Sequence, residues 1–334
     1  MNFGATILDA DALRLSKDEK AFFRDADPFG FILFARNVDT PDQVYGLCSE
    51  MRDAVGREAP ITIDQEGGRV QRLRSPTWRE WAAPLDFVRA AGDDAPRAMY
   101  LRYRLIAAEL KALSIDSNCA PMVDLVVDKT HRFLENRCYG TDASAIAEIG
   151  RAVADGHLDG GVLPVLKHIP GHGRTDLDSH YDLPRVDEDL DTLREFDFAP
   201  FRALNDLPMG MTAHVVYSAI DEDPATLSRD TMDMVRRDIG FDGLIMTDDI
   251  GMKALSGTKG DIAKRALAAG CDVILHCNDP LAVRIEVANA AGQMSDAAQT
   301  RAEAALAARC TPDDIDIADL NAELEALLGG RLDG

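Results

Sequence analysis

The chain has 334 residues, and its 46% hydrophobic and 28% charged residues are typical of a globular protein. Its 58 acidic and 36 basic residues give a formal net charge of −22. This charge argues against nucleic acid or an anionic membrane as a partner, because both bind basic surfaces. No stretch approaches the ~20 apolar residues of a membrane span, and the first 30 residues contain no apolar core of a signal peptide. We therefore expect a cytoplasmic protein, whose six cysteines are reduced.

Short apolar runs alternate with longer amphipathic segments along most of the chain. Strands are predicted over residues 5–8, 30–34, 61–64, 115–119, 162–166, 210–214, 244–247 and 272–275. Helices are predicted over residues 41–55, 95–112, 143–155, 189–204, 229–238, 262–269 and 280–294.

This alternation predicts an α/β fold, a single (β/α)8 TIM-type barrel with C-terminal helices. We expect the barrel over about residues 5–295 and the terminal helices over about 296–330, so that residues 1–334 form one domain. A doubly wound open sheet is the alternative, but no Gly-x-Gly-x-x-Gly sequence follows a strand to support dinucleotide binding.

In such a barrel the chemistry lies at the carboxyl ends of the strands. Polar groups stand at five of the eight predicted ends, around Asp64, Cys119, Lys167, His214 and Asp248. A carboxylate at the end of the seventh strand can face the barrel mouth, where it is suited to act as a nucleophile or general base.

Asp248 is followed directly by a second aspartate, Asp249. Adjacent residues of a strand point to opposite sides. We expect one of the two to face the site and the other to cap the next helix or bind backbone N–H groups; the alternative is that both are caps.

The loop after the fifth predicted strand concentrates groups that exchange protons near neutral pH. It reads Lys-His-Ile-Pro-Gly-His-Gly from Lys167 to Gly173 and continues to Asp178 and His180. Asp178 beside His180 suggests a carboxylate that orients an imidazole for proton transfer. The histidines and Asp178 could instead ligate zinc. Because the loop is rich in glycine and proline whereas metal sites usually draw on rigid elements, we expect no metal.

Arginines also lie on loops of the same predicted barrel face. Arg69 and Arg72 follow Asp64 in a Gly-Gly loop, and Arg137 follows the fourth strand. Asp is a natural partner for sugar hydroxyls, and Arg for hydroxyl, carbonyl or carboxylate oxygens. Together these residues suggest a polar cleft that binds sugar.

The chain resembles the one-domain β-N-acetylglucosaminidases of glycoside hydrolase family 3 from Gram-negative bacteria. The matching stretches run in the family's order over about residues 5–280. They are Asp-Gln-Glu-Gly-Gly-Arg-Val-Gln-Arg from Asp64, Ala-Pro-Met-Val-Asp from Ala120, Glu-Asn-Arg from Glu135, Lys-His-Ile-Pro-Gly-His-Gly from Lys167, Asp-Ser-His from Asp178, Met-Thr-Ala-His from Met211, and Thr-Asp-Asp-Ile-Gly-Met from Thr247. The family usually has Phe at the position of Ile169 and Asp at that of Arg174, which we expect to alter loop packing only.

The resemblance implies a retaining, two-step hydrolysis without a cofactor. By analogy Asp248 is the nucleophile, and His180, assisted by Asp178, is the acid and base. The substrate-binding roles that it implies fall on Asp64, Arg72, Arg137, Lys167, His168, His214 and Met252.

The implied substrate is N-acetylglucosamine β-1,4-linked to 1,6-anhydro-N-acetylmuramic acid, with or without peptide. Cleavage of this small molecule by a cytoplasmic monomer would serve peptidoglycan recycling. Three alternatives remain: a phosphorylase that resolves the intermediate with phosphate, a non-catalytic sugar sensor, and a metal-dependent amidohydrolase-like barrel.

Overall fold

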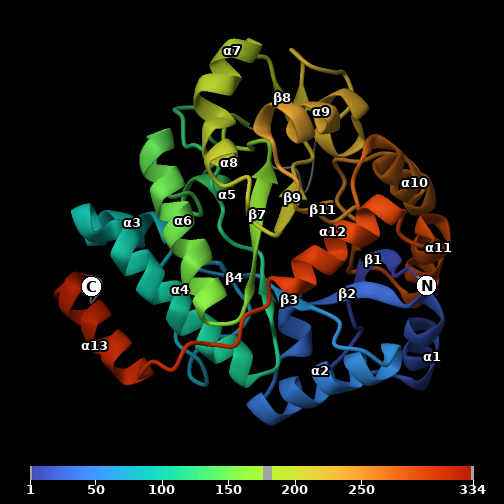
Figure 1. Ribbon diagram of the computed structural model, residues 1–334, viewed down its shortest axis with the longest axis horizontal. Coiled ribbons are helices and arrows are strands. Elements are labelled where there is room, and N and C mark those ends of the chain that lie inside the picture. The colour runs from blue at the N-terminus through green and yellow to red at the C-terminus, as the bar shows by residue number, and fades with distance from the viewer. Residues whose placement is uncertain (1, 176–182, 332–334) are drawn as a thin grey trace.

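Eight parallel strands surround a common axis in the computed structural model, which describes residues 2–175 and 183–331 (Figure 1). Their order is β11-β9-β7-β6-β3-β2-β1-β12, and a parallel bridge between Met246 and Val273 nearly closes the barrel. The predicted TIM-type barrel is confirmed, with strands near all eight expected positions. They are β1 (Gly4–Leu8), β2 (Pro28–Leu33), β3 (Ile61–Ile63), β6 (Ser117–Asn118), β7 (Leu163–Ile169), β9 (Met209–Thr212), β11 (Leu244–Met246) and β12 (Ile274–His276).

Helices cover the outside of the barrel (Figure 1). They are α1 (Lys17–Ala26), α2 (Pro41–Val55), α3 (Pro84–Ala91), α4 (Ala95–Ala112), α5 (Arg132–Glu135), α6 (Ala143–Asp159), α7 (Leu190–Thr192), α8 (Ala199–Ala203), α9 (Arg229–Met234), α10 (Lys259–Ala269), α11 (Leu281–Ala291), α12 (Asp296–Ala307) and α13 (Ile317–Leu328). Short 3-10 turns lie at η1 (Ala35–Asn37), η2 (Gly92–Asp94) and η4 (Ala225–Leu227). None of these described helices is long and apolar enough to cross a membrane.

Two predicted helices depart from regular α geometry. The helix expected over 189–204 is α7 and α8 joined by the π-helical turn η3 (Leu193–Asp197). The helix expected over 229–238 is α9 followed by a second π-helical turn, η5 (Val235–Ile239). The apolar pattern located these segments correctly, but it does not report a change in the backbone hydrogen-bond pattern.

Helix α1 is one element that the apolar pattern did not predict. It begins at a capping box, in which the Ser16 hydroxyl accepts from the backbone N–H of Glu19 and the Glu19 carboxylate accepts from the backbone N–H of Ser16. This pair satisfies two backbone donors that a helix start otherwise leaves unpaired. The Ser-x-x-Glu spacing was the local signal that could have located the helix.

Two small sheets lie outside the barrel. The hairpin of β4 (Gln65–Gly67) and β5 (Val70–Gln71) follows β3 directly, and β8 (Arg185–Val186) pairs with β10 (Val216–Tyr217). The hairpin matters most for the site, because it brings Arg72 back to the carboxylate of Asp64, which directly follows β3.

The terminal helices pack outside the barrel, as expected, and α13 contacts α4 and α3 at one edge of the molecule (Figure 1). The assignment of residues 1–334 to one domain stays a prediction.

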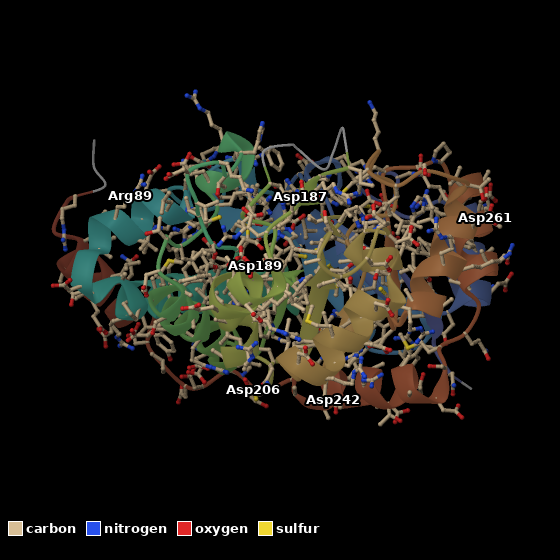
Figure 2. All side chains as sticks on the ribbon, turned by 90° about the horizontal axis from the view of Figure 1, so that it is seen from above. Arg89, Asp187, Asp189, Asp206, Asp242 and Asp261 are labelled. Carbon is tan, nitrogen blue, oxygen red and sulfur yellow. The ribbon has the colours of Figure 1, made fainter. Side chains whose placement is uncertain are left out.

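The exposed carboxylates that Figure 2 labels come from different segments of the chain, among them Asp206, Asp242 and Asp261. The acidic charge is therefore spread over several elements.

Candidate active site

A cavity of about 260 Å3 opens at the carboxyl ends of the barrel strands. This volume lies just below the ~300–1,000 Å3 of pockets for drug-sized ligands, so it suits a ligand of about one sugar ring. Six of the seven predicted binding residues line it, together with the predicted nucleophile. The lining residues are Ile32, Phe34, Asp64, Arg69, Val70, Arg72, Phe133, Arg137, Lys167, His168, Met211, Asp248, Asp249, Met252, Leu275, Cys277 and Asn278.

Asp64 lies between two cations at the end of β3. Arg72 donates to its Oδ2 atom at 2.9 Å, and the Nζ atom of Lys167 lies 3.3 Å from Oδ1. Burial alone would raise the pKa of Asp64, but the charges of Lys167 and Arg72 outweigh burial and hold that pKa below its usual value. Asp64 is therefore an anionic acceptor suited to sugar hydroxyls.

Glu66, which the sequence analysis did not single out, binds two of the predicted residues. Its carboxylate accepts from the Nε and NH2 atoms of Arg137, at 2.9 and 2.7 Å. The Nζ atom of Lys167 lies 2.5 Å from Glu66 Oε1. The pKa of Lys167, which burial alone would lower, is instead raised by the charges of Glu66 and Asp64. Both cations are thus held at the cavity in their charged forms.

His168 lies near the end of β7, and a buried aspartate, Asp124, orients its ring. Its Nδ1 atom lies 2.7 Å from Oδ2 of Asp124, and Asp124 also accepts from the backbone N–H of His172 at 2.6 Å. Burial would raise the pKa of Asp124, but the neighbouring His168 holds it below its usual value. With Nδ1 bound to Asp124, the ring nitrogen of His168 that can serve a ligand is Nε2.

The two adjacent aspartates after β11 have different surroundings. Asp249 accepts from the backbone N–H groups of Gly251 and Cys277, at 2.8 and 3.2 Å. Burial raises the pKa of Asp249 to about 6, and the charge of Asp248 adds to that shift. Burial would also raise the pKa of Asp248, but the nearby His214 and other charges keep it below its usual value. Asp248 is the carboxylate suited to act as an anionic nucleophile.

His214 lies beside these aspartates and is not among the residues that line the cavity. Its Nδ1 atom lies 2.7 Å from the Thr226 hydroxyl, and its Nε2 atom lies 3.1 Å from the backbone oxygen of Asp249. The structure therefore places His214 against the backbone that carries the aspartates.

The predicted acid–base pair, Asp178 and His180, lies outside the described residues. Within residues 2–175 and 183–331, no group of three or more His, Cys, Asp or Glu side chains could hold a metal ion.

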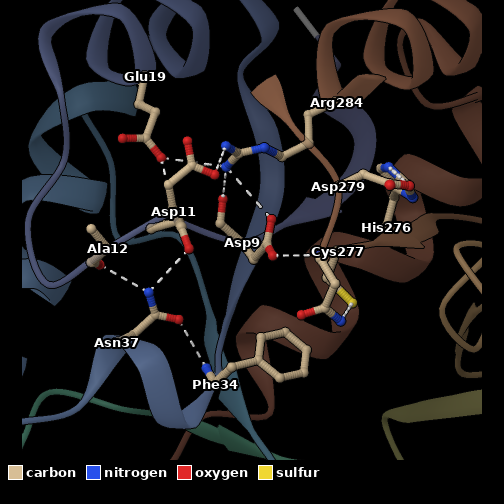
Figure 3. Close-up of polar contacts among 12 residues, drawn as sticks. Asp9, Asp11, Ala12, Glu19, Phe34, Asn37, His276, Cys277, Asp279 and Arg284 are labelled. Atoms are coloured by element: carbon tan, nitrogen blue, oxygen red, sulfur yellow. Dashed lines mark hydrogen bonds and ion pairs between the residues drawn. The ribbon is translucent and has the colours of Figure 1, made fainter. Parts of the chain in front are cut away.

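An ion-pair cluster beside the cavity joins helix α11 to helix α1 and to the segment that follows β1 (Figure 3). The buried guanidinium of Arg284 contacts the carboxylates of Asp9, Asp11 and Glu19. Asp9 in turn accepts from the backbone N–H of Asn278, a lining residue, at 2.7 Å. The cluster thus fixes one wall of the cavity.

Comparison with known proteins identifies the family of this site. The model of the glycosyl hydrolase family 3 N-terminal domain matches residues 6–309. The chain belongs to glycoside hydrolase family 3. It is therefore a glycoside hydrolase, and the resemblance noted in the sequence is confirmed.

Several relatives share this family 3 fold over most of their length. The chain is 36% identical to the β-hexosaminidase of Alkalilimnicola ehrlichii over 85% of this chain and 83% of that protein. It is 36% identical to the β-hexosaminidase of Pseudomonas aeruginosa over 85% and 86%. NagZ from Neisseria gonorrhoeae superposes with a TM-score of 0.85 and 30% identity over 98% and 97%. The same NagZ in complex with N-trifluoroacetyl-D-glucosamine gives a TM-score of 0.84 at 30% identity, again over 98% and 97%.

Proposed function

We propose that this family 3 hydrolase is a retaining exo-β-N-acetylglucosaminidase that removes the non-reducing terminal N-acetylglucosamine from 1,6-anhydro-muropeptides in peptidoglycan recycling. The observation that carries the proposal is the placement of Asp248 in a one-sugar cavity with Asp64, Lys167 and His168. Two kinds of comparison support the sugar: the relatives named β-hexosaminidases, and the NagZ complex with an N-acylated glucosamine.

In the first step Asp248 attacks the anomeric carbon of N-acetylglucosamine and displaces the aglycone oxygen. His180 gives its proton to that oxygen, and Asp178 orients the imidazole. A glycosyl ester of Asp248 results, with inversion at the anomeric carbon.

In the second step water attacks the anomeric carbon of this ester from the face that the aglycone left. Neutral His180 takes the proton of the water, and the Asp248 carboxylate leaves. The second inversion restores the β configuration. A histidine serves both steps because it must be protonated in one and neutral in the next.

Other lining residues bind the sugar in this proposal. Asp64 accepts from hydroxyl groups, while Arg72, Arg137, Lys167 and His168 donate to oxygens of the ring substituents. Met252 packs against the ligand, and His214 supports the Asp249 backbone. We further propose a single-domain, cytoplasmic monomer that acts without a cofactor or metal on a small-molecule substrate, not on nucleic acid or a membrane.

The test compares hydrolysis of the 4-nitrophenyl β-N-acetylglucosaminide with that of the 4-nitrophenyl β-glucoside, in the presence of EDTA. We expect nitrophenol release from the acetamido sugar alone, and loss of that release in Asp248→Asn. Equal hydrolysis of both glycosides would contradict the specificity, and inhibition by EDTA would favour a metal-dependent reaction.

Two further measurements test the finer parts of the proposal. Hydrolysis of N-acetylglucosaminyl-1,6-anhydro-N-acetylmuramic acid tests the natural substrate. Formation of a sugar 1-phosphate in phosphate buffer would replace the hydrolase with a phosphorylase.

A further inference from the structure

Glu66 is 1% exposed and lies behind the cavity rather than on its wall. It belongs to β4, which follows β3 and pairs with β5. Its backbone oxygen accepts from the Tyr103 hydroxyl at 3.2 Å and from the guanidinium of Arg102 on the same helix, α4. The position of Glu66 is therefore set from the outer helix layer.

The next residue, Gly67, makes this arrangement possible. Its φ of +110° is a conformation that glycine adopts without strain. A Cβ atom there would stand 1.9 Å from Arg102 NH2 and 2.7 Å from the backbone oxygen of Ala82. Only glycine lets Arg102 reach the backbone oxygen of Glu66.

Three N–H donors converge on the Glu66 carboxylate from two cavity-lining residues. Arg137 donates from Nε to Oε2 and from NH2 to Oε1, and Lys167 Nζ shares Oε1 with the latter donor. Lys167 lies in β7 and Arg137 follows α5, 30 positions apart in the chain, and no other carboxylate that is described binds them both within 4.0 Å. Glu66 is the common support of these two cations.

We infer that Glu66 is a positioning residue for the glycosidase reaction, which holds the Lys167 ammonium and the Arg137 guanidinium at the sugar and balances their charge. The inference rests on the proposed function of the cavity. It also assigns a role to the Glu of the Asp-Gln-Glu-Gly-Gly sequence, which does not itself line the cavity.

The charge balance matters because glycoside hydrolysis passes through an oxocarbenium-like transition state. In this ion-pair network Lys167, Arg137 and Arg72 carry three positive charges, and Asp64 and Glu66 carry two negative charges. Without Glu66 the surplus of positive charge would increase beside a sugar that itself becomes cationic. Lys167, Arg137 and Arg72 would still bind oxygens of the sugar, but their charge would oppose the positive charge that the sugar gains in the transition state.

The first variant to test is Glu66→Gln, which keeps the volume and removes the charge. An amide offers one acceptor oxygen and one NH2 group, so it cannot accept all three converging N–H groups. Misplacement of binding groups by about 1 Å costs on the order of 100-fold in rate, and we expect a fall of about that size in kcat/KM. Glu66→Asp keeps the charge but is one methylene shorter, so it cannot hold both cations; we expect a smaller fall of about 10-fold.

A double-mutant cycle with Lys167→Met separates positioning from a general loss of structure. If Glu66 acts through Lys167, then Glu66→Gln should lower kcat/KM much less in the Lys167→Met background than in the wild type. Coupled residues give such non-additive effects, whereas independent effects multiply. Binding of N-acetylglucosamine, measured by calorimetry, should weaken in parallel and needs no turnover.

Asp116→Asn is the matched control. Asp116 is likewise buried, at 5% exposure, and is held by two arginines, with Arg52 NH2 at 3.1 Å and Arg309 Nε at 3.2 Å. It lies at the start of β6, the opposite end of the barrel from the cavity. We expect a lower melting temperature with kcat/KM within about 3-fold of wild type, because neither arginine reaches the cavity.

Two results would overturn the inference alone: wild-type kcat/KM in both Glu66 variants, or a Glu66→Gln effect that multiplies fully with Lys167→Met. If Glu66→Gln does not fold, normal kinetics in Glu66→Asp would still overturn it. A third outcome would separate the two proposals. If the wild type binds N-acetylglucosamine but hydrolyses no glycoside, and Glu66→Gln loses that binding, the proposed function is contradicted and the positioning role stands.

Discussion

The Nδ1 atom of His168 lies 2.7 Å from Oδ2 of Asp124, whose carboxylate is completely buried. This contact fixes both the tautomer and the rotation of the imidazole. The same carboxylate accepts from the backbone N–H of His172, so one buried charge organises the loop that leads from β7 toward the predicted acid–base pair.

Removal of the Asp124 charge tests this role. In Asp124→Asn the His168 ring loses a charge-assisted hydrogen bond of about 1.5–3 kcal/mol, so we expect kcat/KM to fall about 10- to 100-fold. Steady-state kinetics on the nitrophenyl glycoside measure the loss. Unchanged kinetics, with the melting temperature lowered as in Asp116→Asn, would make the contact purely structural.

Asp248→Ala should abolish turnover while the protein still folds, because it removes a carboxylate rather than a packed apolar group. Nitrophenol release and thermal unfolding measure the two effects. Substantial remaining activity would identify Asp249 or another residue as the nucleophile.

His180→Ala should slow substrates with poor leaving groups much more than nitrophenyl glycosides. The reason is that departure of nitrophenolate needs little protonation, whereas a sugar hydroxyl must be protonated as it leaves. The comparison is between kcat/KM for the nitrophenyl glycoside and for the disaccharide. Equal losses on both would rule against His180 as the acid of the first step.

Asp249→Asn should stabilise the protein at pH 8 relative to the wild type. Burial raises the pKa of Asp249 from its ordinary 3.8 to about 6 in the folded state. Because the folded protein binds the proton of Asp249 more tightly than the unfolded chain does, protonated Asp249 contributes fully to stability below pH 3.8. This contribution to the free energy of unfolding is lost as the pH rises through 6. The gain in melting temperature of the variant should therefore grow between pH 4 and pH 6 and then level off.

Asp248→Asn provides a control of opposite sign for that measurement. The pKa of Asp248 is lowered in the folded state, so its charge stabilises the fold above the ordinary pKa and the contribution is lost on acidification. This variant should be less stable than the wild type at neutral pH, with a difference that shrinks toward acid. The same pH trend in both variants would contradict the assigned environments.

Gly67→Ala should destabilise the protein and reduce activity, because a Cβ atom would displace Arg102 from the Glu66 backbone. Two other glycines separate the steric clash with Arg102 from the backbone strain of a positive φ. Gly56 has a φ of +66° and open space where a Cβ atom would stand, so Gly56→Ala should cost only the backbone strain, about 1–2 kcal/mol. Gly46 lies in α2 with open space around it, so Gly46→Ala should stabilise by up to about 1 kcal/mol. Denaturant unfolding measures all three, and equal losses at Gly67 and Gly56 would exclude the steric role.

Much of the fold and part of the site could be predicted without coordinates. The eight barrel strands lie near the predicted runs. Most of them are short apolar segments, as buried parallel strands usually are, whereas β6 (Ser117–Asn118) is polar. The rule that chemistry lies at the carboxyl ends of strands, together with the family resemblance, located Asp64, Lys167 and Asp248, which line one cavity. His214 came from the same rule, yet its ring turns to Thr226 and the Asp249 backbone.

What the sequence by itself determined is the order of the eight barrel strands and of most helices, and with it the set of loops that meet at one end of the barrel. These follow from local periodicity, because each strand or helix must bury its own apolar side chains. The tertiary structure alone decided which charges pair: Glu66 with Lys167 and Arg137, and Asp124 with His168. It also decided that Asp248 and Asp249 differ in pKa. Pairing and burial depend on distances between residues far apart in the chain, and no local pattern contains those distances.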